Sequence, residues 1–504
     1  MDGRQNPARR RSFGVNIAMS DPQHDNIGFA LLRSAQEYAD QTAIRSENAE
    51  ISYGQFATLT ANFAQHLLKN GVKQRDTVAV RTRDLVVYLA SIFACALVGA
   101  RWIATPSDDT LIQKADIDHF LETDPEMVAQ NGKVLLVDQT WAAPLPNNEK
   151  RAFPGYADKE DIFMIGKSSG TTGIPKLVAT SFRACFAKFT ERSLSLRLNR
   201  KRITGLFKIG AGTMNTHYIS ALLCGGEICS SPDLDSILQN KVDLVFGSPS
   251  QVQKIIGNTR LPIKLPLLKF GGAAVPDQVI VDLLDSFEKV LVNYGSSEAG
   301  SMCGAMYSLD GAELKSVPIP SSTTVEIVDE ATGEICKPGM EGAVRAKGDS
   351  LASFYIGDAE ATQRAFHDGW FYSGDLGQIS AQGILKITGR IDERINIAGT
   401  KVLANLLDQI MISSHGVKDA ICFMVPRAEG SERLTAFVVL EPGCAQDEVF
   451  TDIRLNLMRS MGQSVVPERF FVVDEIPKTE TGKPNRRACV ALVLEAREKR
   501  QTNT

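Results

Sequence analysis

The feature that most constrains this chain is a glycine- and hydroxyl-rich segment that directly follows a short apolar run. Residues 162–165 read Ile-Phe-Met-Ile, which predicts a buried strand, and residues 168–176 continue as Ser-Ser-Gly-Thr-Thr-Gly-Ile-Pro-Lys. Glycines let backbone N–H groups turn toward an anion, the hydroxyls add donors, and Lys176 adds a positive charge. The segment therefore predicts a phosphate-binding loop. Taken alone, it is also compatible with a plain polar surface loop.

The spacing of this segment differs from that of P-loop NTPases. Those proteins have four residues between the two glycines and a Ser or Thr after the Lys. Here two residues separate Gly170 from Gly173, and Leu177 follows Lys176. We therefore expect a phosphate loop of another class.

Length and periodicity indicate the fold class. A chain of 504 residues is too long for one ordinary core and predicts a large domain with a smaller one. Apolar residues recur at helical spacing over 56–67, Gly71 ends that pattern, and residues 77–80 read as a strand. Alternation of this kind predicts an α/β architecture. Residues 85–100 form the longest uncharged apolar run, and we expect a buried helix there because the run is short for a membrane span.

Charge and cysteine usage exclude several classes of function. The net charge of −4 gives no electrostatic reason to expect a nucleic-acid partner. The nine cysteines contain no CxxC pair, and the six histidines show no ligand spacing. This pattern favours a reducing cytoplasm over a disulfide framework or a zinc site built from protein ligands. We expect any metal to arrive with a nucleotide.

Residues 168–176 resemble the phosphate loop of the adenylate-forming superfamily, which includes acyl- and aryl-CoA synthetases, amino-acid adenylation domains and beetle luciferases. Further motifs follow in the order of that superfamily. Residues 292–300 are similar to its YGxTE element, with Ser297 in place of Thr. The later elements are matched by residues 368–377, 388–402 and 476–486. The resemblance extends over residues 27–493.

The resemblance implies a large N-terminal domain of α/β subdomains and a smaller, mobile α+β C-terminal domain. We expect a disordered extension over 1–22, the large domain over 23–391 and the small domain over 392–504. The basic residues before position 22 also fit a transit peptide, and Met19 fits an alternative start. Asp392 would be the hinge, and Gly399 would leave room for a pantetheine arm.

The same resemblance implies a site for ATP and Mg²⁺. Tyr294 would lie along the adenine, Asp375 would accept from the ribose hydroxyls, and Glu298 would help to hold Mg²⁺. The residues expected to bind the nucleotide are Ser168, Ser169, Gly170, Thr172, Gly173, Lys176, Gly271, Gly272, Ala273, Asn293, Tyr294, Gly295, Ser297, Asp375 and Arg390.

Three residues are expected to act in the reaction. Lys483 would stabilise the charge shared by the attacking carboxylate and the α-phosphate, Thr171 would orient the leaving pyrophosphate, and His217 would line the mouth of the acyl pocket. A lone histidine between apolar stretches is also typical of a structural residue. No cysteine is given a role, including Cys303 near the expected acyl pocket.

The expected activity is ligation of a carboxylic acid to a thiol through an acyl-adenylate, with coenzyme A as the acceptor. No motif for binding an α-amino group is present, so we expect an acyl or aryl acid. The pocket is expected to be apolar, with walls formed by His217, Gly247, Gly272 and Met302. An acyl carrier protein is the alternative acceptor. A non-catalytic nucleotide-binding paralogue is the alternative of another class, because Asn396 and residues 403–408 depart from the common pattern.

Overall fold

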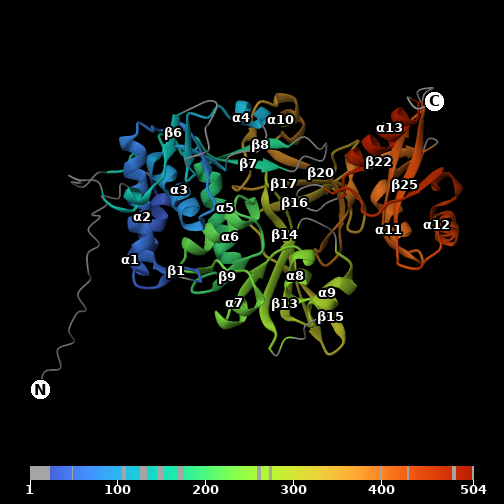
Figure 1. The fold of residues 1–504 in the computed structure, drawn as a ribbon, viewed down its shortest axis with the longest axis horizontal. Coiled ribbons are helices and arrows are strands. Elements are labelled where there is room, and N and C mark those ends of the chain that lie inside the picture. Colours follow the sequence, from blue (N-terminus) through green and yellow to red (C-terminus); the bar gives the residue numbers. More distant parts are fainter. Residues whose placement is uncertain are drawn as a thin grey trace, which may run out of the picture.

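The computed structural model describes residues 23–47, 49–104, 109–124, 133–144, 152–168, 175–257, 261, 263–271, 275–397, 400–427, 431–478 and 484–501. The N-terminal part, in blue, green and yellow, forms the larger body, and the C-terminal part, in orange and red, lies at one side of it (Figure 1). The predicted N-terminal extension over 1–22 lies outside the described residues.

The first sheet carries the strand that leads into the glycine-rich segment. Its strand order is β18-β8-β7-β4-β3-β5-β6, with β7 to β6 parallel and β8 and β18 antiparallel at one edge. The strands are β3 (Thr77–Arg81), β4 (Arg101–Ala104), β5 (His119–Glu122), β6 (Lys133–Leu136), β7 (Ile162–Ser168), β8 (Lys176–Ser181) and β18 (Phe354–Tyr355). The predicted strands at 77–80 and 162–165 are confirmed as parts of β3 and β7.

The second sheet has nine strands in the order β15-β14-β13-β12-β11-β9-β10-β1-β2. Strands β13 to β1 run parallel, whereas β14, β15 and β2 are antiparallel to their neighbours. The strands are β1 (Thr42–Arg45), β2 (Glu50–Ser52), β9 (Arg202–Gly205), β10 (Glu227–Cys229), β11 (Leu244–Phe246), β12 (Leu265–Gly271), β13 (Phe287–Ser296), β14 (Gly300–Asp310) and β15 (Glu313–Ile319).

Helices pack with both sheets, and the largest apolar cluster joins α1–α3, α5 and α6. The long helix predicted from apolar spacing is α2, which begins with a capping box between Ser52 and Gln55. The helices of this part are α1 (Ile27–Glu37), α2 (Tyr53–Lys69), α3 (Leu85–Val98), α4 (Asp109–Ala115), α5 (Phe182–Ser195), α6 (Gly212–Leu222), α7 (Leu234–Gln239), α8 (Pro249–Ile256), α9 (Asp277–Leu283), α10 (Ala359–Ala365) and the short 3₁₀ turn η2 (Gln139–Ala142). The α/β prediction is confirmed.

A third sheet lies between the large body and the C-terminal part. Its order is β16-β17-β20-β19, and β21 pairs with β20. The strands are β16 (Thr324–Val328), β17 (Gly342–Lys347), β19 (Phe366–His367), β20 (Trp370–Ile379) and β21 (Leu385–Arg390).

The C-terminal part has its own apolar core, built wholly from residues after position 396. A hairpin of β22 and β23 leads into a three-stranded sheet of β24, β25 and β26, flanked by helices (Figure 1). The elements are η3 (Ile391–Glu393), β22 (Arg394–Ile397), β23 (Thr400–Leu403), α11 (Ala404–Ile412), β24 (Val417–Pro426), β25 (Glu432–Leu440), α12 (Gln446–Met461), η4 (Gln463–Val465), β26 (Arg469–Val472) and α13 (Arg486–Gln501).

Helix α3 is the buried helix expected at residues 85–100. Asp84 caps its first turn by accepting from the backbone N–H groups of Val86 and Val87. Gly99 ends it with a φ of 81°, which a residue with a Cβ seldom adopts. A Cβ at Gly99 would also lie 1.8 Å from the carbonyl oxygen of Gly155. Within the described part of the chain, no helix combines the length and apolarity needed to cross a membrane.

Replacing Gly99 tests this close packing. We expect Gly99→Ala to lower the free energy of unfolding by about 3 kcal/mol, because left-handed strain and a backbone clash add together. Gly71 has a φ of 91° and open space around its Cβ position, so Gly71→Ala should cost only the strain, about 1 kcal/mol. Urea denaturation of both variants gives the comparison. Equal losses would contradict the role given to the contact with Gly155.

Candidate active site

The ends of the glycine-rich segment face each other across a hairpin. Ser168, the last residue of β7, pairs with Lys176, the first residue of β8. Both residues therefore lie at the edge of the first sheet where the parallel strand β7 ends, a common place for ligand sites in α/β folds. Of the predicted loop, Ser169, Gly170, Thr171, Thr172 and Gly173 lie outside the described residues.

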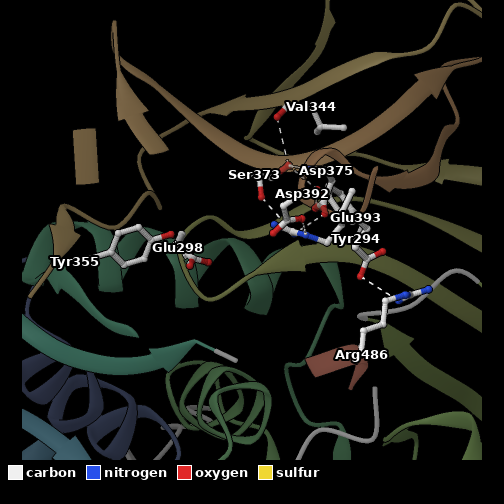
Figure 2. Close-up of polar contacts among 10 residues, drawn as sticks. Tyr294, Glu298, Val344, Tyr355, Ser373, Asp375, Asp392, Glu393 and Arg486 are labelled. Atoms are coloured by element: carbon white, nitrogen blue, oxygen red, sulfur yellow. Dashed lines mark hydrogen bonds and ion pairs between the residues drawn. The ribbon is translucent and has the colours of Figure 1, made fainter. Parts of the chain in front are cut away.

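Tyr355 joins the glycine-rich segment to the predicted metal ligand. The Lys176 ammonium lies 4.7 Å from the centre of the Tyr355 ring, and the Tyr355 hydroxyl donates to Glu298 Oε1 at 2.8 Å. Figure 2 shows Tyr355 and Glu298 side by side. Because Glu298 Oε2 makes no hydrogen bond to any described residue, one carboxylate oxygen is available to a cation. Glu298 is 7% exposed.

The segment between β13 and β14 is held against β7 and α5 by two polar contacts. The Ser297 hydroxyl lies 3.4 Å from the backbone oxygen of Lys167, and the Lys188 ammonium on α5 donates to the Ser297 carbonyl at 3.1 Å. Burial lowers the pKa of Lys188, and the nearby Glu298 carboxylate opposes that change. Gly295 permits the tight turn, because a Cβ there would lie 2.0 Å from the Gly300 carbonyl oxygen.

A second polar cluster surrounds Asp375. Asp375 and Arg390 are direct partners on β20 and β21, and Arg390 Nη1 donates to Asp375 Oδ1 at 2.7 Å. The Tyr294 hydroxyl donates to the other carboxylate oxygen of Asp375 and lies 3.1 Å from the Ser373 hydroxyl. Figure 2 shows Tyr294, Ser373 and Asp375 gathered at this point. Burial and the Asp375 charge both raise the pKa of Tyr294, so its hydroxyl stays a donor.

Tyr294 and Glu298 belong to one short segment, so the two clusters are parts of a single site. Each carboxylate oxygen has two acceptor positions, and Asp375 therefore retains capacity for a bound hydroxyl. Lys176, Ser168 and Ser297 can donate to phosphate oxygens on the side of Glu298. Together these groups suit a ligand with a polyol at one end and phosphates at the other.

The adenine-side residues are described in part. Gly271 ends β12 and pairs with Asn293 on β13, and a Cβ at Gly271 would lie 2.3 Å from the Asn293 carbonyl oxygen. Asn293 Oδ1 accepts from the Ser301 hydroxyl at 2.5 Å. Gly272 and Ala273 lie outside the described residues.

His217 is buried in α6 in its neutral form. Its Nδ1 lies 2.7 Å from the Thr213 carbonyl oxygen, which requires the proton to sit on Nδ1. The ring stacks on Phe246 with 4.3 Å between centroids, and Nε2 has no partner among the described residues. Burial, with help from the positive charges of Lys269 and Arg192, lowers the pKa of His217 well below its usual value.

The described residues on either side of the segment that contains Lys483 pair with each other. Lys478 and Pro484 make an isolated antiparallel bridge, and Lys483 itself lies outside the described residues. Gly399 also lies outside them. Within the described chain, no group of three or more His, Cys, Asp or Glu side chains could hold a metal ion. A magnesium ion that keeps most of its ligands as phosphate oxygens and water needs only a single carboxylate such as Glu298.

Ion pairs connect the start of the C-terminal part to β21 on one side and to α13 on the other. Arg390 Nε donates to Asp392 Oδ1 at 2.8 Å, and Arg486 on α13 lies 3.7 Å from Glu393 (Figure 2). Arg486 also pairs with Asp408. Burial raises the pKa of Asp408 to about 6 although Arg486 lowers it. Asp408 is the acid that remains in the altered segment 403–408, and it forms an ion pair inside the C-terminal part.

Several contributing residues escaped the sequence analysis. Tyr355, Lys188 and Arg192 belong to none of the motifs. Lys269 lies in the stretch that leads to Gly271, where it is a charge inside the apolar run 267–270, but it was given no role. The predicted pocket wall Met302 is buried among Ala299, Ala346 and Phe371. Burial raises the pKa of Cys303 to about 12, which keeps that thiol protonated.

Comparison with known proteins places this chain in a family. Residues 31–356 match the model of the AMP-binding enzyme family, and residues 406–483 match that of the AMP-binding enzyme C-terminal domain. A feruloyl-CoA synthase from an Amycolatopsis species is 25% identical, covering 92% of this chain and 98% of the relative. The 2-succinylbenzoate–CoA ligase of Bacillus subtilis is 21% identical, covering 90% of this chain and 95% of the relative.

Solved structures share the fold. ATP-bound MatB from Rhodopseudomonas palustris superposes with a TM-score of 0.79 at 20% identity, covering 93% of this chain and 98% of that one. The O-succinylbenzoate coenzyme A synthetase of Bacillus subtilis in complex with AMP gives 0.77 at 19% identity, covering 91% and 97%. The first family match alone covers more than half of the sequence. The chain therefore belongs to the AMP-binding enzyme family, with the adenylate-forming fold that its ordered motifs predicted.

Proposed function

We propose that this protein is an ATP-dependent acid–thiol ligase that joins an acyl or aryl carboxylic acid to coenzyme A. One observation supports this proposal most directly. The segment 293–298 connects the Asp375 cluster to the group formed by Lys176, Tyr355 and Glu298. Relatives that cover most of the chain are named as CoA synthases or ligases, which supports the thiol acceptor.

The residues divide the work of the first half-reaction. The substrate carboxylate attacks the α-phosphorus of ATP, an oxygen–phosphorus bond forms, and pyrophosphate leaves. Asp375, with Arg390 and Tyr294 beside it, would hold the ribose, and Ser297 would donate to the α-phosphate. Gly271, Gly272, Ala273, Asn293 and Gly295 would shape the adenine side. Lys483 would act at the reacting centre, where negative charge spreads over the oxygens of the attacking carboxylate and of the α-phosphate.

The phosphate side would neutralise and orient the leaving group. Lys176 and the hydroxyl-rich loop, with Ser168, Ser169, Gly170, Thr171, Thr172 and Gly173, would bind the β- and γ-phosphates. Glu298 fits a magnesium ligand, because one of its oxygens is held by Tyr355 and the other makes no hydrogen bond to described residues. Magnesium would supply charge neutralisation at the phosphates when bound.

In the second half-reaction the thiol attacks the acyl carbon, a thioester forms, and AMP leaves. We propose that the chain divides at 391/392, that residues 392–504 rotate about Asp392, and that Gly399 lines the thiol path. Residues 1–22 would lie outside the folded domains. His217 would form part of the acyl pocket wall. The nine free cysteines suit a reducing, cytoplasmic location.

Pyrophosphate release from ATP and Mg²⁺ tests the proposal directly. We expect release with one class of fatty, aryl, short-chain or amino acid, and conversion to thioester and AMP only when coenzyme A is added. Release that stalls at a bound adenylate would indicate a carrier-protein acceptor. If no acid causes pyrophosphate release, the ligase proposal is contradicted and a non-catalytic nucleotide-binding protein is favoured.

Lys483→Ala should lower pyrophosphate release by about 100-fold or more, because it removes a donor aimed at the charge that develops in the transition state. Lys478→Ala is the matched control, since Lys478 pairs with Asp419 at 3.5 Å on the same loop base. Steady-state rates at saturating ATP give the comparison. Full activity in Lys483→Ala would refute its catalytic role.

Asp375→Ala should weaken ATP binding about tenfold or more, because a charge-assisted hydrogen bond contributes about 1.5–3 kcal/mol. Arg390 keeps Asp392 as a partner in this variant, which protects the fold. Asp310→Ala, at an exposed position on β14, is the control. Calorimetric titration with ATP measures both, and an unchanged affinity in Asp375→Ala would exclude the ribose role.

Tyr355→Phe should raise the Mg²⁺ concentration for half-maximal pyrophosphate release about tenfold, since the hydroxyl fixes the Glu298 carboxylate and such outer partners tune metal affinity. Tyr307→Phe is the control, because Tyr307 makes no hydrogen bond with its hydroxyl among the described residues. A magnesium titration at fixed ATP decides between them. Identical curves would show that Tyr355 does not position Glu298 for the metal.

A further inference from the structure

The turn that carries Glu298 is held through its backbone. Residues 297–299 connect β13 to β14, and their three successive carbonyl groups each accept a hydrogen bond from another segment. The contacts are Lys188 Nζ to the Ser297 oxygen at 3.1 Å, the Ala352 N–H to the Glu298 oxygen at 2.6 Å, and the Ser350 hydroxyl to the Ala299 oxygen at 3.2 Å. The contact from Lys188 is the charge-assisted one, and such hydrogen bonds are roughly twice as strong as neutral ones.

Lys188 reaches this turn from α5 across Gly300. A Cβ at Gly300 would lie 3.1 Å from Lys188 Cε and 3.3 Å from Lys188 Cγ, so the lysine side chain runs directly over this glycine. Gly300 also has a φ of 68°, which a residue with a Cβ seldom adopts. Helix α5 packs against β14, and Lys188 is half-buried between them. The glycine therefore leaves the lysine a path to the Ser297 carbonyl.

The Lys188 ammonium contacts the backbone of the turn and leaves the Glu298 carboxylate without an ion pair. Among the described residues, the Ser297 carbonyl is the only hydrogen-bond acceptor of Lys188, and no carboxylate forms an ion pair with it. The Glu298 side chain is held instead through Oε1 by the Tyr355 hydroxyl (Figure 2). An ion pair at the carboxylate would occupy an oxygen that a metal needs. Lys188 thus fixes the turn while Glu298 Oε2 stays available.

We propose that Lys188 is a positioning residue for the first half-reaction, which fixes the turn 297–299 so that Glu298 stays oriented toward Mg²⁺ and Ser297 toward the α-phosphate. This inference rests on the proposed ligase function. Lys188 acts through the backbone of the turn, because its ammonium contacts a carbonyl oxygen there. Loss of a partner that orients a metal-binding side chain lowers metal affinity by about 10–100-fold.

Lys188→Met keeps the length of the side chain and removes the donor. We expect the Mg²⁺ concentration for half-maximal pyrophosphate release to rise about tenfold, because the turn loses its charged donor. Thioester formation from a supplied acyl-adenylate should be unchanged, since pyrophosphate and its metal have already left at that stage. Lys188→Arg keeps a charged donor and should retain most of the wild-type response to Mg²⁺. Lys289→Met, at an exposed position on β13, is the matched control.

The sign of the change separates this role from a purely electrostatic one. Removing a cation near Glu298 would by itself strengthen the attraction of the carboxylate for Mg²⁺ and lower the concentration required. A lower or unchanged requirement in Lys188→Met would therefore overturn the inference and leave the ligase function standing. Equal losses in pyrophosphate release and in thioester formation would also overturn it, because they would indicate a general structural role.

Calorimetric titration gives a readout that does not need turnover. ATP is titrated into the wild-type protein and Lys188→Met, each with and without Mg²⁺. We expect Mg²⁺ to strengthen ATP binding to the wild-type protein, and this gain to be about tenfold smaller in Lys188→Met. If no acid releases pyrophosphate, the ligase proposal fails and this titration decides the inference separately. An equal gain in both proteins, or no gain in the wild-type protein, would overturn the positioning role.

Discussion

The carboxylate of Asp375 is the interaction on which the candidate site depends. It receives Arg390 from β21 and the Tyr294 hydroxyl from β13, so it joins the third sheet to the second. This partly buried carboxylate is held in one orientation by its two donors. The segment after Tyr294 then runs to Glu298 and Tyr355 at the first sheet. Residues 294–298 therefore link the two hydrogen-bonded clusters, which together connect the three sheets.

The polar groups of the site are arranged by charge. On the side of Glu298, Lys176 and Lys188 lie near one carboxylate, and a magnesium–phosphate group would complete the balance. On the other face of β13, Arg192 is buried and Glu191 lies beside it. Because strands present alternate residues to opposite faces, β13 presents Tyr294 to Asp375 and Asn293 to the side of Arg192.

The C-terminal part is coupled to the site through a short chain of ion pairs. Arg390 contacts both Asp375 and Asp392, so the nucleotide cluster and the proposed hinge share one guanidinium. Arg486 in turn contacts Glu393 beside the hinge and Asp408 in the small-domain core. Occupation of the ribose site would thus act on the same arginine that holds the hinge residue. This arrangement connects the small domain physically to the candidate nucleotide site.

Local sequence determined the elements and their order. An apolar run before a glycine- and hydroxyl-rich segment specified β7 and its loop, and apolar spacing with Ser52 and Gly71 specified α2, because these signals act within a few residues. The ordered motifs also named Tyr294, Glu298, Asp375 and Arg390. Only the tertiary structure decided that Tyr355 holds Glu298 and that His217 stacks on Phe246. Those contacts join segments that are distant in the sequence. Burial and the presence of a counter-charge depend on how the whole chain packs, so no short stretch of sequence reveals them.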